Sequence, residues 1–246
     1  MTGNALEEKT RSNSKKGAET YSSAIESASN YHGWILDEFA PFIGNKVLEV
    51  GLGHGNYRKQ LDKSISYIGI DIDPISVANA PKFSDSDKFI CADIAKPDFT
   101  HLVPGGLDSV VCINVIEHIE DDQAAVSNLV SVLRPGGYVL LFVPAFEMLY
   151  NDLDSLAGHY RRYNLSDLKR LAERAGAQAH KCYYFNPVGG LGWFANKFVR
   201  HESLNEDSVN GQIELFDRYI LPFSRVLNSI SGPFFGQSAI MVARKR

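Results

Sequence analysis

The chain alternates short apolar runs with segments of helical periodicity, and this alternation limits its possible folds more than any other feature. The segment from Val126 to Leu133 repeats apolar residues at the spacing of one helix face. Short, continuously apolar runs are typical of strands that are buried on both sides of a parallel sheet. The pattern therefore predicts an α/β fold, a mostly parallel sheet with helices on both faces. The seven predicted strands cover residues 46–50, 67–70, 88–91, 108–113, 138–143, 180–185 and 238–243.

The spacing of these runs also predicts the domain organisation. Residues 1–18 are polar, mixed in charge and without periodicity, so we expect a disordered tail ahead of one domain over residues 19–246. The last two strands are separated by residues 186–236. Usual connections have about 4–6 residues, so this segment is interpreted as a helical insertion that forms a lid over an acceptor.

Composition excludes several classes of protein. The 25 Lys and Arg residues against 29 Asp and Glu residues give a net charge of −4, which argues against a nucleic-acid partner. No apolar run reaches the roughly 18–20 residues that a membrane span needs. Three widely spaced cysteines indicate neither disulfides nor a zinc cluster, so we expect a cytoplasmic protein. Peripheral membrane contact and the oligomeric state stay open.

The segment after the first strand carries the strongest indication of a ligand. Gly51, Gly53 and Gly55 alternate there, so the backbone can turn tightly and approach a bound molecule. An ordinary strand-to-helix turn would have the same glycines. Two acids favour the ligand: Asp71 ends the next strand, where it can accept ribose hydroxyls, and Glu49 precedes the glycines. The Glu49 carboxylate would repel the pyrophosphate of a dinucleotide but suits a cationic group.

This arrangement resembles the class I S-adenosylmethionine-dependent methyltransferases, whose loop reads E/D-x-G-x-G-x-G. Further motifs that match in order lie at 68–71, 91–94, 114–118 and 133–137, and together they cover roughly residues 45–145. The resemblance implies a sheet order of 3-2-1-4-5-7-6 with strand seven antiparallel. It also implies S-adenosylmethionine as the cofactor and S-adenosylhomocysteine as the product.

The resemblance further implies a set of cofactor contacts. Asp71 would bind the ribose, and Asp93 would lie near the adenine amino group. The complete set is Glu49, Gly51, Gly53, Gly55, Asn56, Tyr57, Asp71, Ile72, Asp93, Ile94, Asn114, Val115 and His118.

A metal site is a competing interpretation of the strand-four motif. Some RNA ribose methyltransferases of this superfamily hold a divalent ion with a Glu-x-x-Glu-His motif and a later histidine. Here Glu117 and His118 are present, and His159 follows, but Asn114 replaces the first glutamate. Because an amide is a poorer ligand for a hard cation, we expect no metal and structural roles for Glu117 and His118.

The segment over residues 152–163 follows strand five and borders the acceptor side in this fold. Its Gly-His-Tyr-Arg-Arg-Tyr sequence resembles a bacterial branch of small-molecule methyltransferases. His159 is the predicted catalytic residue, a general base. In the alternative, Arg161 and Arg162 pair with Asp152 and Asp154, and His159 only packs the loop. The predicted substrate contacts are Tyr21, Tyr31, Tyr160, Arg161, Arg162 and Tyr163.

Together these features predict a biosynthetic enzyme that methylates an oxygen or nitrogen of a small, aromatic or apolar acceptor. One alternative is a methyltransferase that acts on a lipid-linked or glycan intermediate at a membrane surface. Another is a cofactor-binding partner protein without catalysis, which the complete cofactor motif argues against.

Overall fold

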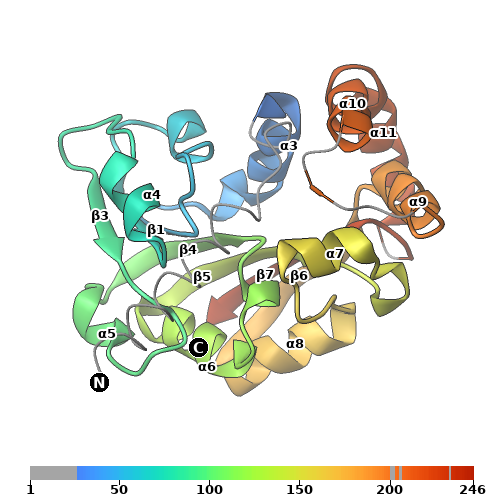
Figure 1. Ribbon diagram of the computed structural model, residues 1–246. Coiled ribbons are helices and arrows are strands. Elements are labelled where there is room, and N and C mark those ends of the chain that lie inside the picture. Colours follow the sequence, from blue (N-terminus) through green and yellow to red (C-terminus); the bar gives the residue numbers. More distant parts are fainter. Residues whose placement is uncertain (1–26, 200–202, 205–206, 233) are drawn as a thin grey trace, which may run out of the picture.

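The computed structural model describes residues 27–199, 203–204, 207–232 and 234–246. The predicted tail and Tyr21 lie outside the described residues. Within them the chain forms a seven-stranded sheet of order β3-β2-β1-β4-β5-β7-β6, in which β7 is antiparallel to both neighbours (Figure 1). The predicted fold class is confirmed. The strands are β1 (Lys46–Val50), β2 (Ser66–Asp71), β3 (Lys88–Cys91), β4 (Leu107–Ile113), β5 (Leu133–Pro144), β6 (Ala177–Phe185) and β7 (Ser238–Lys245).

Helices cover both faces of the sheet (Figure 1). The α-helices are α3 (Ser29–Phe39), α4 (Pro74–Asn79), α5 (Phe99–Leu102), α6 (Asp122–Ser131), α7 (Asp152–Ala157), α8 (Leu165–Arg174), α9 (Pro187–Asn196), α10 (Asp207–Leu215) and α11 (Leu221–Ser231). Short 3₁₀ turns are η1 (Ala40–Phe42), η2 (Arg58–Gln60), η3 (Ile116–His118) and η4 (Glu147–Leu149), and η5 (Phe216–Ile220) is a π-helix.

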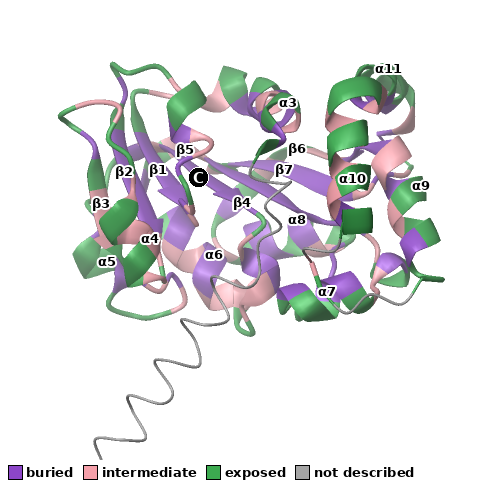
Figure 2. Cartoon of the chain, turned by 45° about the horizontal axis from the view of Figure 1, so that its top comes forward, coloured by how far each residue is buried: buried purple, intermediate pink, exposed green. Residues whose placement is uncertain are grey.

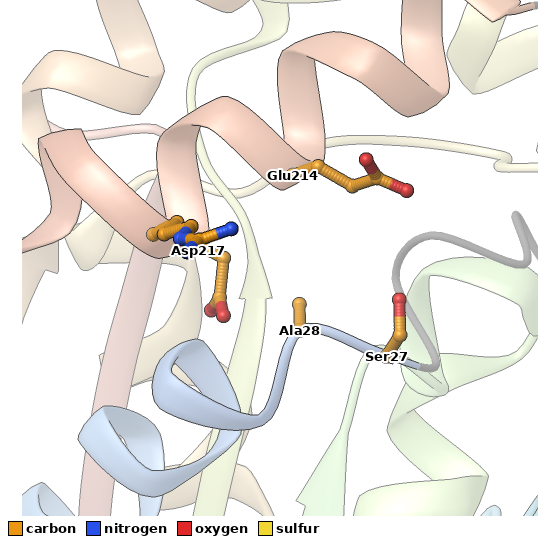
Figure 3. A pocket seen from close by; sticks show the side chains of 5 residues that line it. Ser27, Ala28, Glu214 and Asp217 are labelled. Carbon is orange, nitrogen blue, oxygen red and sulfur yellow. The ribbon is translucent and has the colours of Figure 1, made fainter.

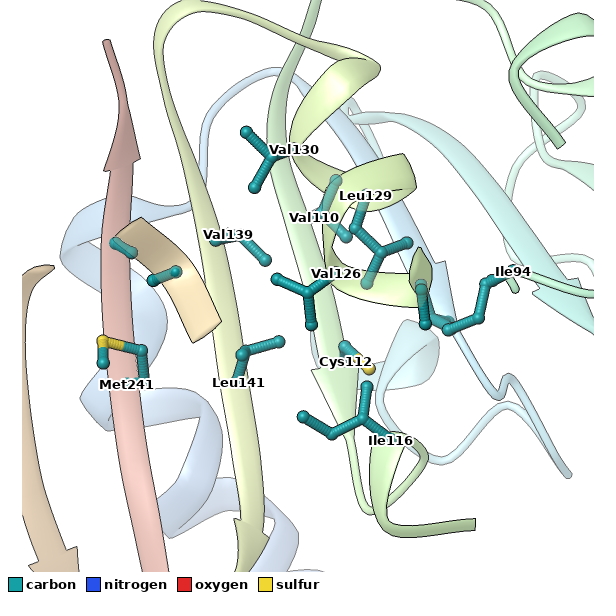
Figure 4. Packing of buried hydrophobic residues seen from close by; sticks show 14 of the residues in the cluster. Ile94, Val110, Cys112, Ile116, Val126, Leu129, Val130, Val139, Leu141 and Met241 are labelled. Atoms are coloured by element: carbon teal, nitrogen blue, oxygen red, sulfur yellow. The ribbon is translucent and has the colours of Figure 1, made fainter. Parts of the chain in front are cut away.

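One hydrophobic core lies between the sheet and helices α5, α6 and α8. Val126 and Leu129 of α6 are fully buried against strand residues such as Val110 and Leu141 (Figure 4). The second core lies on the other face, where Trp34 and the rest of the inner side of α3 pack on the sheet. The carboxyl ends of the parallel strands therefore lie along one edge of the sheet, between the helices that cover its two faces. Ligands of open α/β sheets bind at this edge.

Several element boundaries differ from the sequence prediction. The stretch after the glycine loop forms the 3₁₀ turn η2, and residues 152–157 form helix α7 where a loop was expected. Strand β5 begins before Pro135, because Leu133 already pairs with Leu107 across a shift in register. Cys91 ends β3 at an exposed position, although it belongs to an apolar run.

The segment between β6 and β7 contains α9, α10, η5 and α11. Helix α9 packs on α11, and η5 packs on α3. The strands are largely buried, whereas α9, α10 and α11 show extensive exposed surface (Figure 2). Among the described residues, no helix is both long and apolar enough to cross a membrane.

Candidate active site at the carboxyl edge of the sheet

The glycine loop is held by backbone contacts to the neighbouring strand. The amides of Gly51 and Leu52 both donate to the carbonyl of Ile70, at 2.8 and 3.0 Å. Gly51, Gly53 and Gly55 have φ values of +73°, +48° and +72°, which L side chains rarely adopt. A Cβ added at Gly51 would lie 2.5 Å from Cγ2 of Val115. The loop therefore packs directly on the end of β4.

Asp71 lies against this loop, as the resemblance implied. Its Oδ2 accepts a hydrogen bond from the Gly53 amide at 3.1 Å, and its Oδ1 accepts one from the Asp73 amide at 2.9 Å. Burial raises the pKa of the Asp71 carboxyl. A carboxylate has about four lone-pair sites, so Asp71 keeps acceptor capacity for the hydroxyls of a ligand.

Glu49 is the most unusual charged group on this side. Its side chain is buried, and Oε2 accepts a hydrogen bond of 2.7 Å from the Tyr67 hydroxyl, but Oε1 has no partner. Burial raises the pKa of Glu49 to about 8. A buried carboxylate oxygen without a donor is costly, so a cationic or hydrogen-bonding group of a ligand would satisfy it. This donor demand fits the amino group of S-adenosylmethionine.

The other predicted cofactor contacts lie along the same edge, in different settings. Ile72 directly follows β2 and is exposed, whereas Ile94 is part of the core. The Oδ1 atom of Asp93 accepts a hydrogen bond from the Ala95 amide at 2.9 Å. Asn56 and Tyr57 lie between the glycines and η2, where the Tyr57 ring is 5.0 Å from that of His32.

The segment after β4 joins this loop to the acceptor side. Asn114 has a φ of +50°, and the turn that follows buries Glu117. The backbone carbonyl of Glu117 accepts a 2.8 Å hydrogen bond from the Tyr160 amide, and the rings of His118 and His159 lie 4.7 Å apart. The structure thus brings His159 beside the predicted cofactor residue His118.

A buried carboxylate orients His159. Nδ1 of His159 lies 2.7 Å from Oδ1 of Asp154, which also accepts a 2.8 Å hydrogen bond from Nε of Arg162. Burial alone would raise the pKa of Asp154, but the hydrogen bond from His159 and the charge of Arg162 hold it below its usual value. The other oxygen of Asp154 accepts a 3.3 Å bond from Nε1 of Trp193. An ionised Asp154 favours the tautomer with the proton on Nδ1 and leaves Nε2 as the acceptor.

The predicted substrate contacts are divided between exposed and buried positions. Tyr160 is exposed, whereas Arg162 and Tyr163 are buried. Arg161 forms an ion pair of 3.0 Å with Asp122, so of the two pairings in the alternative interpretation, only that of Arg162 with Asp154 is observed. The ring of Tyr31 packs in the second core against aromatic residues.

Glu117 is a second buried carboxyl group with unpartnered oxygens. Neither of its side-chain oxygens has a hydrogen bond, and burial raises the pKa of Glu117 to about 7. Burial also lowers the pKa of His118 to about 4. Glu117, His118 and His159 each offer one ligand atom, all within 4.8 Å of one another, so this cluster could hold a metal ion. The expectation that no metal is needed rests on Asn114 and stays a prediction.

Sequence reasoning missed Asp154 as the partner of His159, and it missed Trp193 as a further donor to Asp154. A signal for the first was present, since Asn151 and Asp154 have the spacing of a capping box, which starts α7. No local pattern relates Trp193 to Asp154, because α9 reaches α7 only through the tertiary fold.

A depression of about 260 Å³ lies between α3 and the insertion (Figure 3). Its lining residues are Ser27, Ala28, Glu214, Asp217 and Arg218. Beside it, Oδ1 of Asp217 accepts a hydrogen bond of 2.7 Å from the Tyr31 amide. The amino-terminal helix and the insertion therefore meet at this depression.

Comparisons with known proteins agree with this geometry. Residues 48–141 match a family described as a methyltransferase domain. A ubiquinone biosynthesis O-methyltransferase of Chromobacterium violaceum is 28% identical over 191 residues, which are 71% of this chain and 79% of that protein. A phosphoethanolamine N-methyltransferase of Haemonchus contortus, solved with S-adenosylhomocysteine, superposes with a TM-score of 0.59 at 19% identity, covering 88% of this chain and 52% of that one. The [4+2]-cyclase SpnF has a TM-score of 0.56 at 17% identity, covering 88% and 80%.

Proposed function

We propose that this chain, a class I S-adenosylmethionine-dependent methyltransferase, moves the methyl group to an oxygen or nitrogen of a small, apolar or aromatic acceptor. The observation that carries the proposal is the continuity of one edge of the sheet. The glycine loop contacts Val115, and the turn after Val115 contacts the segment that bears His159. The residues predicted to hold the cofactor thus lie next to the segment that carries His159, which supports the proposal. The relatives named O-methyltransferases add support for oxygen.

The residues proposed to hold the cofactor are those whose carboxylate oxygens can still accept hydrogen bonds. Asp71 accepts the ribose hydroxyls while the Gly53 amide fixes its carboxylate. Glu49 offers its unpartnered oxygen to the amino group. When bound, S-adenosylmethionine supplies a methyl group that its sulfonium has already activated. The main task of the protein is then alignment, which can contribute roughly 7–11 kcal/mol to lowering the barrier.

His159 is proposed as the general base. Asp154 accepts a hydrogen bond from Nδ1–H of His159, so Nε2 is free to take the proton that an acceptor hydroxyl or amine loses as its bond to the methyl group forms. Arg162 keeps Asp154 ionised, and the Trp193 indole fixes the second oxygen of that carboxylate. Both are positioning residues, because they act through Asp154.

The insertion over residues 186–236 is proposed as the lid over the acceptor. Helix α9 contributes Trp193 to the surroundings of His159, and the exposed ring of Tyr160 lies next to that histidine in the chain. Tyr31, Arg161, Arg162 and Tyr163 then act mainly by shaping the wall of the site, since contacts within the protein already occupy their polar groups.

A test must separate methyl transfer from cofactor binding alone, because the fold also occurs in a cyclase. Purified protein is incubated with methyl-labelled S-adenosylmethionine and fractionated cell extract, with Asp71→Ala as the matched control. We expect label in acceptor material with the wild-type protein and much less with the variant. Tight binding of the cofactor without transfer of labelled methyl to any fraction would contradict the proposed enzymatic function. It would favour the non-catalytic alternative.

A further inference from the structure

Helix α11 has its apolar side turned to solvent. The residues that it buries include Ser224 and Asn228, which bind Asn186 through hydrogen bonds of 2.8 and 2.9 Å. Phe223 and Ile230 are instead 71% and 72% exposed. An amphipathic helix of a globular protein normally buries its apolar stripe. The polar inner side is therefore satisfied, and the apolar outer side has no partner within the described chain.

Helix α9, which packs on α11, repeats this arrangement. It buries Asn196, whose amide donates to Gln212 at 3.1 Å, and it exposes Leu191 and Phe194. Phe198 follows the helix and is 76% exposed, with its ring 5.4 Å from that of Phe194. Several large apolar side chains exposed on two helices that pack together indicate an interaction surface. We define the outer surface by Leu191, Phe194, Phe198, Phe223, Val226, Leu227 and Ile230.

Charge on these two helices has one sign. Neither α9 nor α11 contains an acidic residue, and their charged groups are Arg225 within α11 and Lys197 directly after α9. Arg225 pairs with Asp37 of α3 at the edge. The acids of the described insertion lie on α10 and η5, where Asp217 binds α3. Exposed phenylalanine and leucine side chains, with a lysine and an arginine near them and no acid on either helix, fit the boundary of an anionic bilayer.

From this surface we infer that α9 and α11 dock on an anionic lipid bilayer, and that the acceptor is an amphiphile presented by that membrane. A protein partner would need polar groups for roughly one hydrogen bond per 100–200 Å² of interface. The outer surface is apolar and offers few such groups.

The surface is continuous with the candidate active site. Trp193 of α9 contacts Asp154, and Nζ of Lys197 donates to the carbonyl of Met148 at 2.9 Å. Met148 itself is exposed beside this contact. An acceptor whose apolar part stays in the bilayer could therefore bring its polar group to His159 along α9. This part of the inference rests on the proposed function, whereas membrane docking does not.

The test is flotation of the full chain with phosphatidylcholine vesicles that contain about 30% phosphatidylglycerol. Phe223→Ser and Ile230→Ser should each lower the fraction bound by about tenfold, because each removes a large apolar side chain from the lipid contact. The matched control is Leu102→Ser on α5, an exposed apolar residue at the other end of the sheet. Affinity for S-adenosylhomocysteine should stay the same in all three variants, which shows that they are folded.

Two results would overturn the docking. The first is absence of wild-type protein from the floated vesicles. The second is a dimer in solution that Phe223→Ser converts to a monomer, which would make the outer surface a contact between copies. The acceptor class is tested separately: label from S-adenosylmethionine should enter solvent-extractable membrane material. Label in aqueous material alone would reject the amphiphile, and no label at all would reject the proposed function but leave the vesicle result standing.

Discussion

The glycine loop after β1 and the segment after β5 lie at the same edge of the sheet, but they are held in different ways. The loop is fixed by backbone amides that bind the adjacent strand at Ile70. His159 is fixed by side chains from distant segments, through Asp154 and its partners Arg162 and Trp193. The cofactor side therefore follows from local sequence, whereas the acceptor side depends on how the insertion packs.

The buried carboxyl groups of the cofactor side and the acceptor side also differ in their hydrogen bonds and in their pKa values. On the cofactor side, Glu49 keeps an oxygen without a partner, and burial raises the pKa of its carboxyl. On the acceptor side, Asp154 has partners on both oxygens, and its pKa is held low. The first carboxyl is thus suited to receive a ligand group, and the second is suited to hold another side chain in place.

The largest effect is expected from His159→Ala. If the two sides act separately, turnover should fall by roughly 10²–10⁴-fold because the base is lost. Affinity for the cofactor should stay within about threefold, since the proposed cofactor contacts lie on strands β1 to β4 and directly after them. Steady-state kinetics and calorimetry on the same preparation measure both quantities. His101→Ala, on α5, is the control.

A purely structural His159 would give another pattern. Thermal stability and cofactor affinity would then decrease together, and a stable variant with full turnover would leave alignment as the whole contribution of the protein.

Asp71→Ala should mainly lower the affinity for the cofactor, whereas His159→Ala should mainly lower turnover. Hydrogen bonds to a charged group are worth roughly 1.5–3 kcal/mol, so cofactor affinity should fall by about 10- to 150-fold. Asp98→Ala, an exposed acid before α5, should leave affinity unchanged. Equilibrium dialysis with labelled S-adenosylmethionine measures the change, and equal affinity of the Asp71 variant and the wild type would remove Asp71 from the site.

Glu49→Gln should alter how stability depends on pH. The pKa of Glu49 rises from 4.5 in its ordinary state to about 8 in the folded protein. Between pH 7 and 8 the folded state therefore holds a proton that the unfolded state has released, and stability falls as pH rises. Over this range the free energy of unfolding should decrease by about 1 kcal/mol more in the wild type than in the variant.

Urea unfolding at the two pH values gives this difference, and it cancels the contribution of Glu117, which both proteins share. Parallel pH profiles of wild type and variant would show that Glu49 is ionised in the folded state.

Chelation is expected to have the smallest effect. Because Asn114 replaces a carboxylate ligand, extensive treatment with EDTA should leave methyl transfer nearly unchanged. The assay compares treated and untreated enzyme in metal-free buffer. A strong loss that magnesium or zinc restores would instead make Glu117, His118 and His159 metal ligands, as their mutual distances allow.

The parts of the molecule that could be predicted from sequence are those fixed by short-range rules. Buried strands appear as continuous apolar runs, and the spacing of Asn164 and Asp167 is that of the capping box that starts α8. The glycine loop could be predicted for the same reason, because backbone positions with positive φ angles favour glycine. Each of these features can be recognised from a few consecutive residues.

The rest depends on long-range packing. The contact of Trp193 with Asp154 joins two elements with β6 and α8 between them, so no local spacing indicates it. The orientation of α11 is a second example: periodicity shows that the helix is amphipathic but not which side faces inward. Asn186 decides this, since it binds Ser224 and Asn228 from within the fold.

The central claim is that the edge formed by the glycine loop, Asp71 and Glu49 holds S-adenosylmethionine. Calorimetric titration with S-adenosylhomocysteine and, separately, with NAD tests it most directly. We expect saturable binding of S-adenosylhomocysteine and no binding of NAD, because the unpartnered oxygen of Glu49 can accept a hydrogen bond from an amino group, which the pyrophosphate of NAD does not offer. Binding of NAD, or of neither compound, would contradict it.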